Sequence, residues 1–254
     1  MTVGRTLREP GFAPPVYVAL DVPEADDARR IVALLGGDAT HYKVGLELYL
    51  AAGGAFVEEL AGLGKSVFLD LKFCDIPNTV AAAVRQAARL GADLLTVHAT
   101  GGGEMLRAAV EAAGEVRTSA GVLVVTALTS LGAGDLAEMG FASASVAEHV
   151  LRLAGMAQQA GAHGVVCSAH ESAALRSAFP ALARLVPGIR PQGASAGDQV
   201  RMATPEDAVQ AGADYLVVGR PVTRAPDPLF ALRALQDDVA AAAAKKLTEG
   251  SDDE

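Results

Sequence analysis

Three charged residues lie close together where a buried strand gives way to a loop. The segment SVFLDL (66–71) is mostly apolar and typical of a core strand, yet Asp70, Lys72 and Asp75 fall within six positions at its end. Charged side chains are rarely fully buried unless they are paired. A lysine held between carboxylates stays protonated and can donate a proton. This spacing indicates proton-transfer chemistry. The alternative is a buried ion pair that only fixes packing, which is a poor source of stability.

The elements that must position these residues alternate between strands and helices. Short apolar runs of strand type occur at eight places, 16–21, 41–47, 66–71, 93–99, 121–128, 164–169, 182–188 and 214–220. Ala-rich segments with helical spacing, such as 24–36 and 79–91, lie between them. Strands that are apolar on both faces are typical of a parallel sheet covered by helices. We therefore predict the α/β class, and eight strands in 254 residues favour a single (β/α)8 TIM barrel.

A doubly wound open sheet is the competing architecture. No G-x-G-x-x-G motif follows the first predicted strand, which removes one support for a dinucleotide-binding sheet. No change of composition divides the chain. Residues 16–245 are expected to form one catalytic barrel, after a polar lead-in (1–15) and before a frayed acidic tail (246–254).

Composition excludes several classes of function. The net charge of −9 argues against a nucleic-acid-binding surface. The sequence has no apolar run of the roughly 18–20 residues that span a membrane, and no apolar signal-peptide core. Cys74 and Cys167 do not form a disulfide framework, so we expect a reducing, cytoplasmic location. His, Cys, Asp and Glu show no convincing metal spacing, so these residues do not indicate a metal site.

Polar residues gather at the carboxyl ends of the predicted strands, which is where barrels of this type carry their chemistry. These residues are Asp21, Lys43, Asp70, Lys72, His98, Thr129, Ser130, Ser168, Arg190, Gly219 and Arg220. Because Asp70 and Lys72 are two positions apart, a regular strand turns both toward the barrel interior. Asp75 lies beyond the strand. It either completes the site in its own chain or reaches into a neighbouring subunit.

A second group of residues is suited to binding a phosphate. In barrels of this type the loops after strands seven and eight often bind phosphate. Gly219 would let the backbone approach the anion and Arg220 would supply a bidentate charged contact. Arg190 and Gln199 could close over the same anion, and Gln192 is a weaker candidate. The alternative is that the arginines are solvated surface residues.

Two further features have weaker chemical meaning. The hydroxyls of the segment LTS (128–130) could hydrogen-bond a planar amide. The segment HATGGG (98–103) is more typical of a turn than of an anion-binding loop. His98 is better explained as a histidine with satisfied hydrogen bonds at the edge of the core than as a catalytic acid or base.

Several motifs occur together in one order, namely VALD, YKVG, DLKFCDIPNT, VHA, ALTS, PGIRPQG with AGDQVRMATP, and VVGRPVT. With these motifs the chain resembles the orotidine 5′-phosphate decarboxylase family of bacterial type, from about Val16 to Asp227. One departure is Cys74, where bacterial relatives usually carry His. The resemblance implies a homodimeric barrel that converts orotidine 5′-monophosphate (OMP) to UMP and CO2, the last step of de novo UMP synthesis. It implies no cofactor and no metal.

The resemblance also implies roles for the matching residues. Lys72 would protonate C6 of the pyrimidine, and Asp70 would lie near the departing carboxylate. Asp75 would join this group from the partner subunit, and Lys43 would link Asp70 to the ribose. The other implied substrate contacts are Asp21 at the ribose, Ile76 and Thr79 beside Asp75, Thr129 and Ser130 near the base, and Arg190, Gln199, Gly219 and Arg220 at the phosphate.

Two other functions remain open at this point. A phosphosugar decarboxylase or synthase can share the D-x-K-x-x-D core, but those enzymes use a divalent metal. A barrel of a different class could bind a phosphorylated nucleoside without turning it over.

Overall fold

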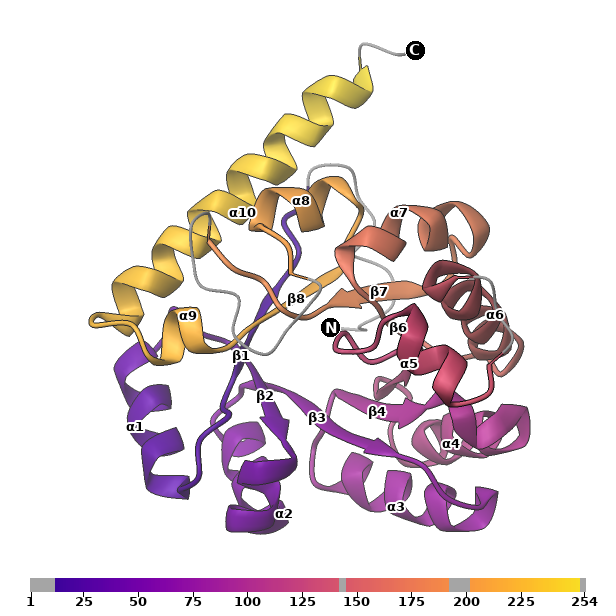
Figure 1. The fold of residues 1–254 in the computed structure, drawn as a ribbon. Coiled ribbons are helices and arrows are strands. Elements are labelled where there is room, and N and C mark those ends of the chain that lie inside the picture. The colour runs from indigo at the N-terminus through magenta and orange to yellow at the C-terminus, as the bar shows by residue number, and fades with distance from the viewer. Residues whose placement is uncertain (1–11, 142–144, 192–201, 252–254) are drawn as a thin grey trace.

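Eight parallel strands form a closed barrel in the computed structural model, which describes residues 12–141, 145–191 and 202–251 (Figure 1). The strands follow one another around the barrel in sequence order, and β1 pairs with β8 to close it. Their bounds are β1 (Val16–Ala19), β2 (His41–Gly45), β3 (Ser66–Phe73), β4 (Leu94–His98), β5 (Gly121–Val125), β6 (Gly164–Val166), β7 (Ala183–Val186) and β8 (Tyr215–Val218). The predicted TIM barrel is therefore confirmed, with one strand in each predicted segment.

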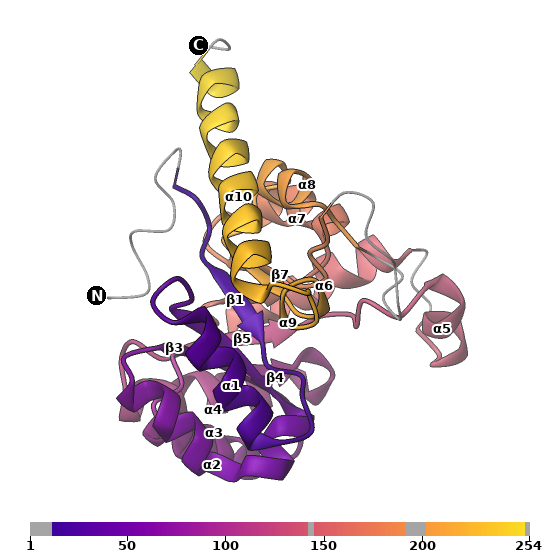
Figure 2. The same cartoon turned by 90° about the vertical axis from the view of Figure 1, so that its left-hand side faces the viewer.

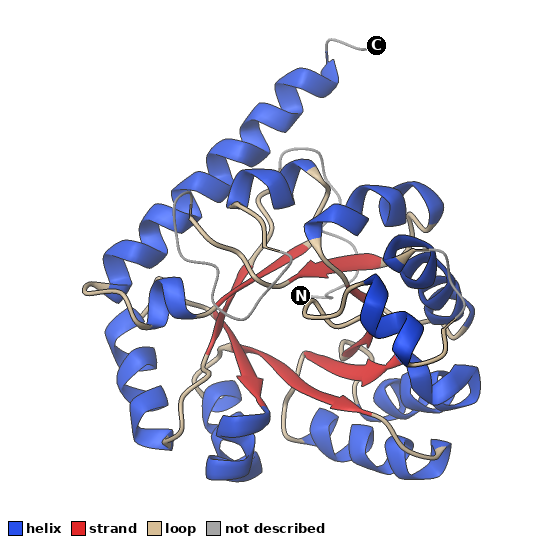
Figure 3. Ribbon diagram, in the orientation of Figure 1, coloured by secondary structure: helices blue, strands red, loops and turns tan. Residues whose placement is uncertain are grey.

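Helices surround this barrel on its outer side (Figure 3). They are α1 (Ala25–Leu35), α2 (Leu46–Gly62), α3 (Pro77–Arg89), the 3-10 helix η1 (Ala99–Gly101), α4 (Gly102–Val116), α5 (Ala133–Glu138), α6 (Val146–Gln159), α7 (Ala169–Ala178), α8 (Pro205–Gln210), α9 (Arg220–Thr223) and α10 (Pro228–Ser251). Gly53, with φ 67°, interrupts α2 and divides it into two helical parts.

The last helix extends further than the sequence suggests. We expected a frayed tail from residue 246, but α10 continues to Ser251 and its end projects beyond the barrel in both views (Figures 1 and 2). Lys246 explains part of this difference, because its Nζ donates to the carbonyl oxygens of Val209 and Gln210 at the end of α8. Cations stabilise the carboxyl end of a helix.

Apolar side chains fill two separate regions. The larger core lies between the strands and the helices and includes Val44, Leu69 and Val97. The smaller core lies inside the barrel and consists of Tyr17, Ala19, Phe68, Leu94, Leu123, Ala183, Leu185, Tyr215 and Val217. The barrel interior is thus packed, and barrels of this type bind their ligands at the carboxyl-end mouth.

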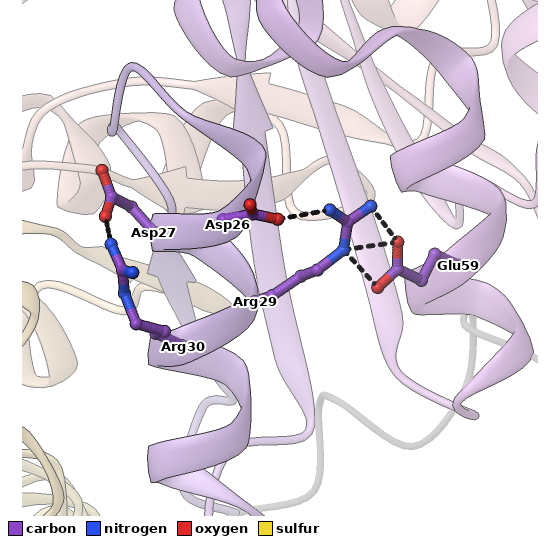
Figure 4. A network of polar contacts seen from close by, with 5 residues as sticks. All are labelled: Asp26, Asp27, Arg29, Arg30 and Glu59. Atoms are coloured by element: carbon purple, nitrogen blue, oxygen red, sulfur yellow. Dashed lines mark hydrogen bonds and ion pairs between the residues drawn. The ribbon is translucent and has the colours of Figure 1, made fainter.

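Ion pairs link neighbouring helices on the outside of the barrel. Arg29 of α1 lies between Asp26 of the same helix and Glu59 of α2 (Figure 4). Its Nε donates to both oxygens of the Glu59 carboxylate, and its Nη2 donates to Oε2. Arg30 pairs with Asp27 one turn earlier in α1. These contacts are exposed, so they contribute little to stability, and the Arg29–Glu59 pair mainly fixes how α1 lies against α2.

Candidate active site

A cavity of about 390 Å³ opens at the carboxyl end of the barrel. Its floor is the top of the interior core, with Ala19, Phe68, Leu185 and Val217. The charged residues in its wall are Asp21, Lys43, Glu47, Asp70, Lys72, Arg190, Arg220 and Arg224. The apolar floor lowers the local dielectric constant below that of water, so charges in the wall interact more strongly than they would in solution.

Four of these side chains form a chain of alternating charge. Lys43 Nζ lies 2.8 Å from Asp21 Oδ1 and 3.8 Å from Asp70 Oδ2. Lys72 Nζ donates to Asp70 Oδ1 at 2.8 Å. The two middle residues of this series are the least exposed, since the side chains of Lys43 and Asp70 are 11% and 14% exposed. The sequence prediction that these residues meet is confirmed.

The backbone brings Lys72 to Asp70 in a different way from the one we predicted. In a regular strand, side chains alternate between the two faces, so Lys72 would face the barrel interior like Asp70. In the structure β3 pairs with β4 through Leu69 opposite Leu95 and Phe73 opposite Val97, so the register shifts between these pairs. Lys72 has φ 51°, a left-handed conformation that non-glycine residues rarely adopt. A bulge in β3 therefore aims the lysine.

Sequence reasoning missed several residues of this site. Thr96 of β4 is fully buried and hydrogen-bonds both Asp70 and the backbone of Lys72. Its only signal is a hydroxyl in the middle of an apolar strand. Gly45 ends β2, where a β-carbon would lie 2.9 Å from Lys43 Nζ and 3.1 Å from Asp21 Oδ1, so a larger residue would crowd this ion pair. Glu47 and Arg224 line the cavity without any motif that we recognised.

The predicted phosphate-binding residues lie on one part of the wall. Arg190 is buried, and its backbone N–H donates to the carbonyl oxygen of Ala203 at 2.9 Å. Gly219 and Arg220 follow β8 and also line the cavity. Gln192 and Gln199 lie outside the described residues, so their predicted contacts stay predictions.

The remaining predicted residues divide into two groups. Thr129 lines the cavity from the loop after β5, which ends at Val125 and not at residue 128 as predicted. Ser130, Asp75, Ile76 and Thr79 are exposed and are not among the described residues that line the cavity. Asp75 Oδ1 accepts a hydrogen bond from the backbone N–H of Ile76 at 2.6 Å, which holds the carboxylate at the start of α3.

His98 has a local structural role at the end of β4. Its Nδ1 lies 2.8 Å from Thr100 Oγ1 and accepts a weak hydrogen bond from the backbone N–H of Thr100, which caps η1. Thr100 Oγ1 in turn lies 3.9 Å from Cys74 Sγ. Burial lowers the pKa of His98, and the positive charge of Lys72 lowers this pKa further. These contacts agree with our interpretation of a satisfied histidine at the edge of the core.

The described residues lack both membrane-spanning helices and clustered metal ligands. The helices in these ranges include none that is long and apolar enough to cross a membrane. The same ranges hold no group of three or more His, Cys, Asp or Glu side chains arranged to bind a metal ion.

The chain matches a known protein family over most of its length. Residues 14–235 match the family described as "Orotidine 5'-phosphate decarboxylase / HUMPS family". The chain belongs to this family. The match spans every strand of the barrel and every charged residue of the cavity wall.

Individual members of the orotidine 5′-phosphate decarboxylase / HUMPS family are similar over nearly their whole length. An orotidine 5′-phosphate decarboxylase of Halorhodospira halophila is 50% identical over 230 residues, which cover 90% of this chain and 97% of the relative. One of Anaeromyxobacter dehalogenans is 53% identical over 222 residues, covering 87% and 96%. The crystal structure of orotidine 5′-phosphate decarboxylase from Lactobacillus acidophilus has a TM-score of 0.79 at 36% identity, covering 90% of this chain and 99% of that one.

Proposed function

We infer that this chain decarboxylates OMP to UMP and CO2, the last step of de novo UMP synthesis. The family also contains other enzymes, but identities of 50% and 53% to curated decarboxylases support this reaction within it. The observation that carries the chemistry is the Lys72 ammonium, held 2.8 Å from Asp70 in the wall of a cavity that also presents Arg190 and Arg220.

The reaction replaces one bond to C6 of the pyrimidine by another. When the bond from C6 to the carboxylate breaks, its electron pair stays on C6 and CO2 leaves. A cation fixed beside C6 stabilises the negative charge that develops there, because it is already in place before the reaction. Lys72 is that cation in our proposal. It then gives a proton from Nζ to C6, which yields UMP, and regains a proton from solvent.

Asp70 and Lys43 form the frame around this proton donor. Asp70 holds Lys72 by a hydrogen bond and lies next to Lys43, so the ammonium of Lys72 stays at one place in the wall. In our proposal Asp70 lies near the departing carboxylate, while Lys43 and Asp21 contact the ribose hydroxyls. The ribose contacts fix the distance between C6 and Lys72.

The other end of the cavity suits the phosphate of OMP. Arg190, Gly219 and Arg220 follow β7 and β8, and two guanidinium groups with a glycine backbone match a phosphate dianion. Phosphate binding far from C6 helps to order the reacting groups, so remote binding energy serves the chemical step. Thr129 and Ser130 would contact the base, and Gln199 would contact the phosphate.

We propose further that the active form is a homodimer in which Asp75, Ile76 and Thr79 enter the partner's site. These residues are exposed on a single chain, although they directly follow the strand that carries Asp70 and Lys72. Large exposed apolar side chains support an interface, since Ile76 is 67% exposed and Leu50 of α2 is 83% exposed. Large exposed apolar side chains that gather together mark interaction surfaces.

A cytoplasmic location is also part of the proposal. Cys74 is exposed and free, and Cys167 is buried and free. Free thiols of this kind are typical of a reducing compartment.

The reaction can be tested by the ultraviolet absorbance change of OMP in EDTA, with UMP identified as product. The wild type should consume OMP, and Lys72→Ala should be nearly inactive while it still binds UMP. Absence of turnover by the wild type would refute the reaction and direct attention to metal-dependent phosphosugar chemistry. Equal turnover by both proteins would keep the reaction and refute the role of Lys72.

The shared site can be tested by mixing two inactive variants, Lys72→Ala and Asp75→Ala. In a mixed dimer one site carries both substitutions and the other carries neither. Random exchange at equal concentrations should therefore restore about a quarter of wild-type activity. If the mixture stays inactive although mass spectrometry shows mixed dimers, Asp75 does not act across the interface.

A further inference from the structure

The bulge in β3 leaves a gap in the ladder of backbone hydrogen bonds beside the proposed proton donor. Leu69 pairs with Leu95 and Phe73 with Val97, so three residues of β3 lie opposite the single residue Thr96 of β4. Buried backbone N–H groups need a partner, and a bulge removes the regular one.

The side chain of Thr96 supplies that partner. Thr96 Oγ1 accepts a hydrogen bond from the backbone N–H of Lys72 at 2.9 Å and donates one to Asp70 Oδ1 at 3.0 Å. Asp70 Oδ1 also accepts from Lys72 Nζ at 2.8 Å. One hydroxyl with no solvent exposure therefore fixes both the backbone and the carboxylate that hold the lysine.

We propose that Thr96 is a positioning residue for decarboxylation, which acts through Lys72 and Asp70 and does not touch the substrate. This inference rests on the proposed function of Lys72 as proton donor. The hydroxyl holds the left-handed backbone of Lys72, whose φ is 51°. It also fixes the rotation of the Asp70 carboxylate, so that Oδ1 faces Lys72 and Oδ2 lies toward Lys43.

A threonine with a purely structural role gives a clear contrast in the same barrel. Thr126 follows β5 and is 1% exposed, and its Oγ1 donates to the carbonyl oxygen of Val166 at 3.0 Å. Its side chain contacts neither Asp70 nor Lys72 by any hydrogen bond in the described structure, and it is not among the described residues that line the cavity. Thr126→Val is therefore a matched control for Thr96→Val.

The test compares Thr96→Val, Thr96→Ser and Thr126→Val. Valine keeps the shape of threonine but lacks the hydroxyl, and serine keeps the hydroxyl. A loss of alignment on the scale of 1 Å costs up to about 100-fold in rate, so Thr96→Val should lower kcat by about 10- to 100-fold. Its Kd for UMP should change less than about threefold. Thr96→Ser should stay near the wild-type kcat. Thr126→Val should lower the melting temperature as Thr96→Val does, but not kcat.

Binding gives a second readout that does not depend on turnover. A UMP analogue with an ionised oxygen on C6 places negative charge where the reaction develops it. Thr96→Val should bind this analogue at least about 10-fold more weakly than the wild type, with UMP affinity unchanged. If the wild type fails to turn over OMP, the proposed function fails, and the two ligand affinities still decide the role of Thr96.

Three results would overturn the inference. Thr96→Val could keep the wild-type kcat and analogue affinity. Thr96→Val and Thr126→Val could lower kcat equally, which would indicate a general effect on stability. Thr96→Ser could be as slow as Thr96→Val, which would mean that the methyl group and not the hydroxyl matters.

Discussion

Replacing Lys72 by glycine should leave the protein more stable than replacing it by alanine, which reverses the usual order of these residues in a strand. Lys72 has φ 51°, and no other non-glycine residue in the described part of the chain has a positive φ. A β-carbon in this left-handed conformation costs roughly 1–2 kcal/mol, whereas glycine adopts it readily. Both variants remove the same ammonium from Asp70, so the difference between them isolates the backbone.

The magnitude follows from two opposing effects. Glycine relieves the left-handed strain, but it also adds freedom to the unfolded chain, which costs about 0.4–1 kcal/mol relative to alanine. Lys72→Gly should therefore exceed Lys72→Ala in free energy of unfolding by about 1 kcal/mol. For a chain of this size that difference corresponds to a melting temperature about 2–4 °C higher.

Urea unfolding and thermal melting of the two variants measure this difference. Lys65 offers a matched control, because it immediately precedes β3, does not have a positive φ, and donates to the carbonyl oxygens of Gly36 and Ala39. There the order should be the usual one, with Lys65→Gly less stable than Lys65→Ala. If Lys72→Ala is as stable as Lys72→Gly while the Lys65 pair behaves normally, Lys72 is not strained and our account of the bulge is wrong.

Two further predictions concern residues away from the cavity. Asp214→Asn removes the carboxylate that lies 2.6 Å from the buried guanidinium of Arg184. The free energy of unfolding, measured in urea, should fall by about 3–5 kcal/mol. Asp38→Asn, at the exposed ion pair with Arg233, should barely change the urea midpoint of unfolding. Burial lowers the pKa of His149, and the charge of Arg152 lowers this pKa further. At about pH 6.5 and below, the unfolded chain therefore binds more protons than the folded one, and the free energy of unfolding decreases as the pH is lowered. His149→Gln should make the free energy of unfolding less dependent on pH between 8 and 5, by at most about 1.4 kcal/mol per pH unit, and parallel curves for the two proteins would contradict this.

The strands and the charged group could be predicted from sequence because they depend on local patterns. Apolar runs of four to eight residues mark buried parallel strands, and the carboxyl ends of such strands meet at one mouth of a barrel. That rule alone places Asp21, Lys43 and Asp70 together, and the structure confirms it. The ends of strands were less predictable, since residues after a strand can stay apolar. Thr129 therefore lies in a loop four residues beyond the end of β5.

The direction of Lys72 shows why the rest could not be predicted. The alternation of side chains along a strand correctly predicted that Lys72 lies beside Asp70, but for the wrong reason. The register shift between β3 and β4 brings them together, and such a shift has no signature in the sequence of either strand alone. Likewise, the hydroxyl of Thr96 acquires its meaning only opposite the bulge. Asp75 follows the same strand, but its role depends on a second chain, which no pattern within one chain describes.

Three departures from ordinary strand rules meet at one atom. A carboxylate faces the barrel interior, a lysine adopts a left-handed backbone, and a hydroxyl interrupts the apolar strand beside them. Each costs stability alone, yet the Thr96 hydroxyl and the Lys72 ammonium both donate to Asp70 Oδ1, so each departure satisfies another. Because backbone strain persists only where its surroundings over-determine it, this convergence favours selection for the position of the Lys72 ammonium over selection for stability.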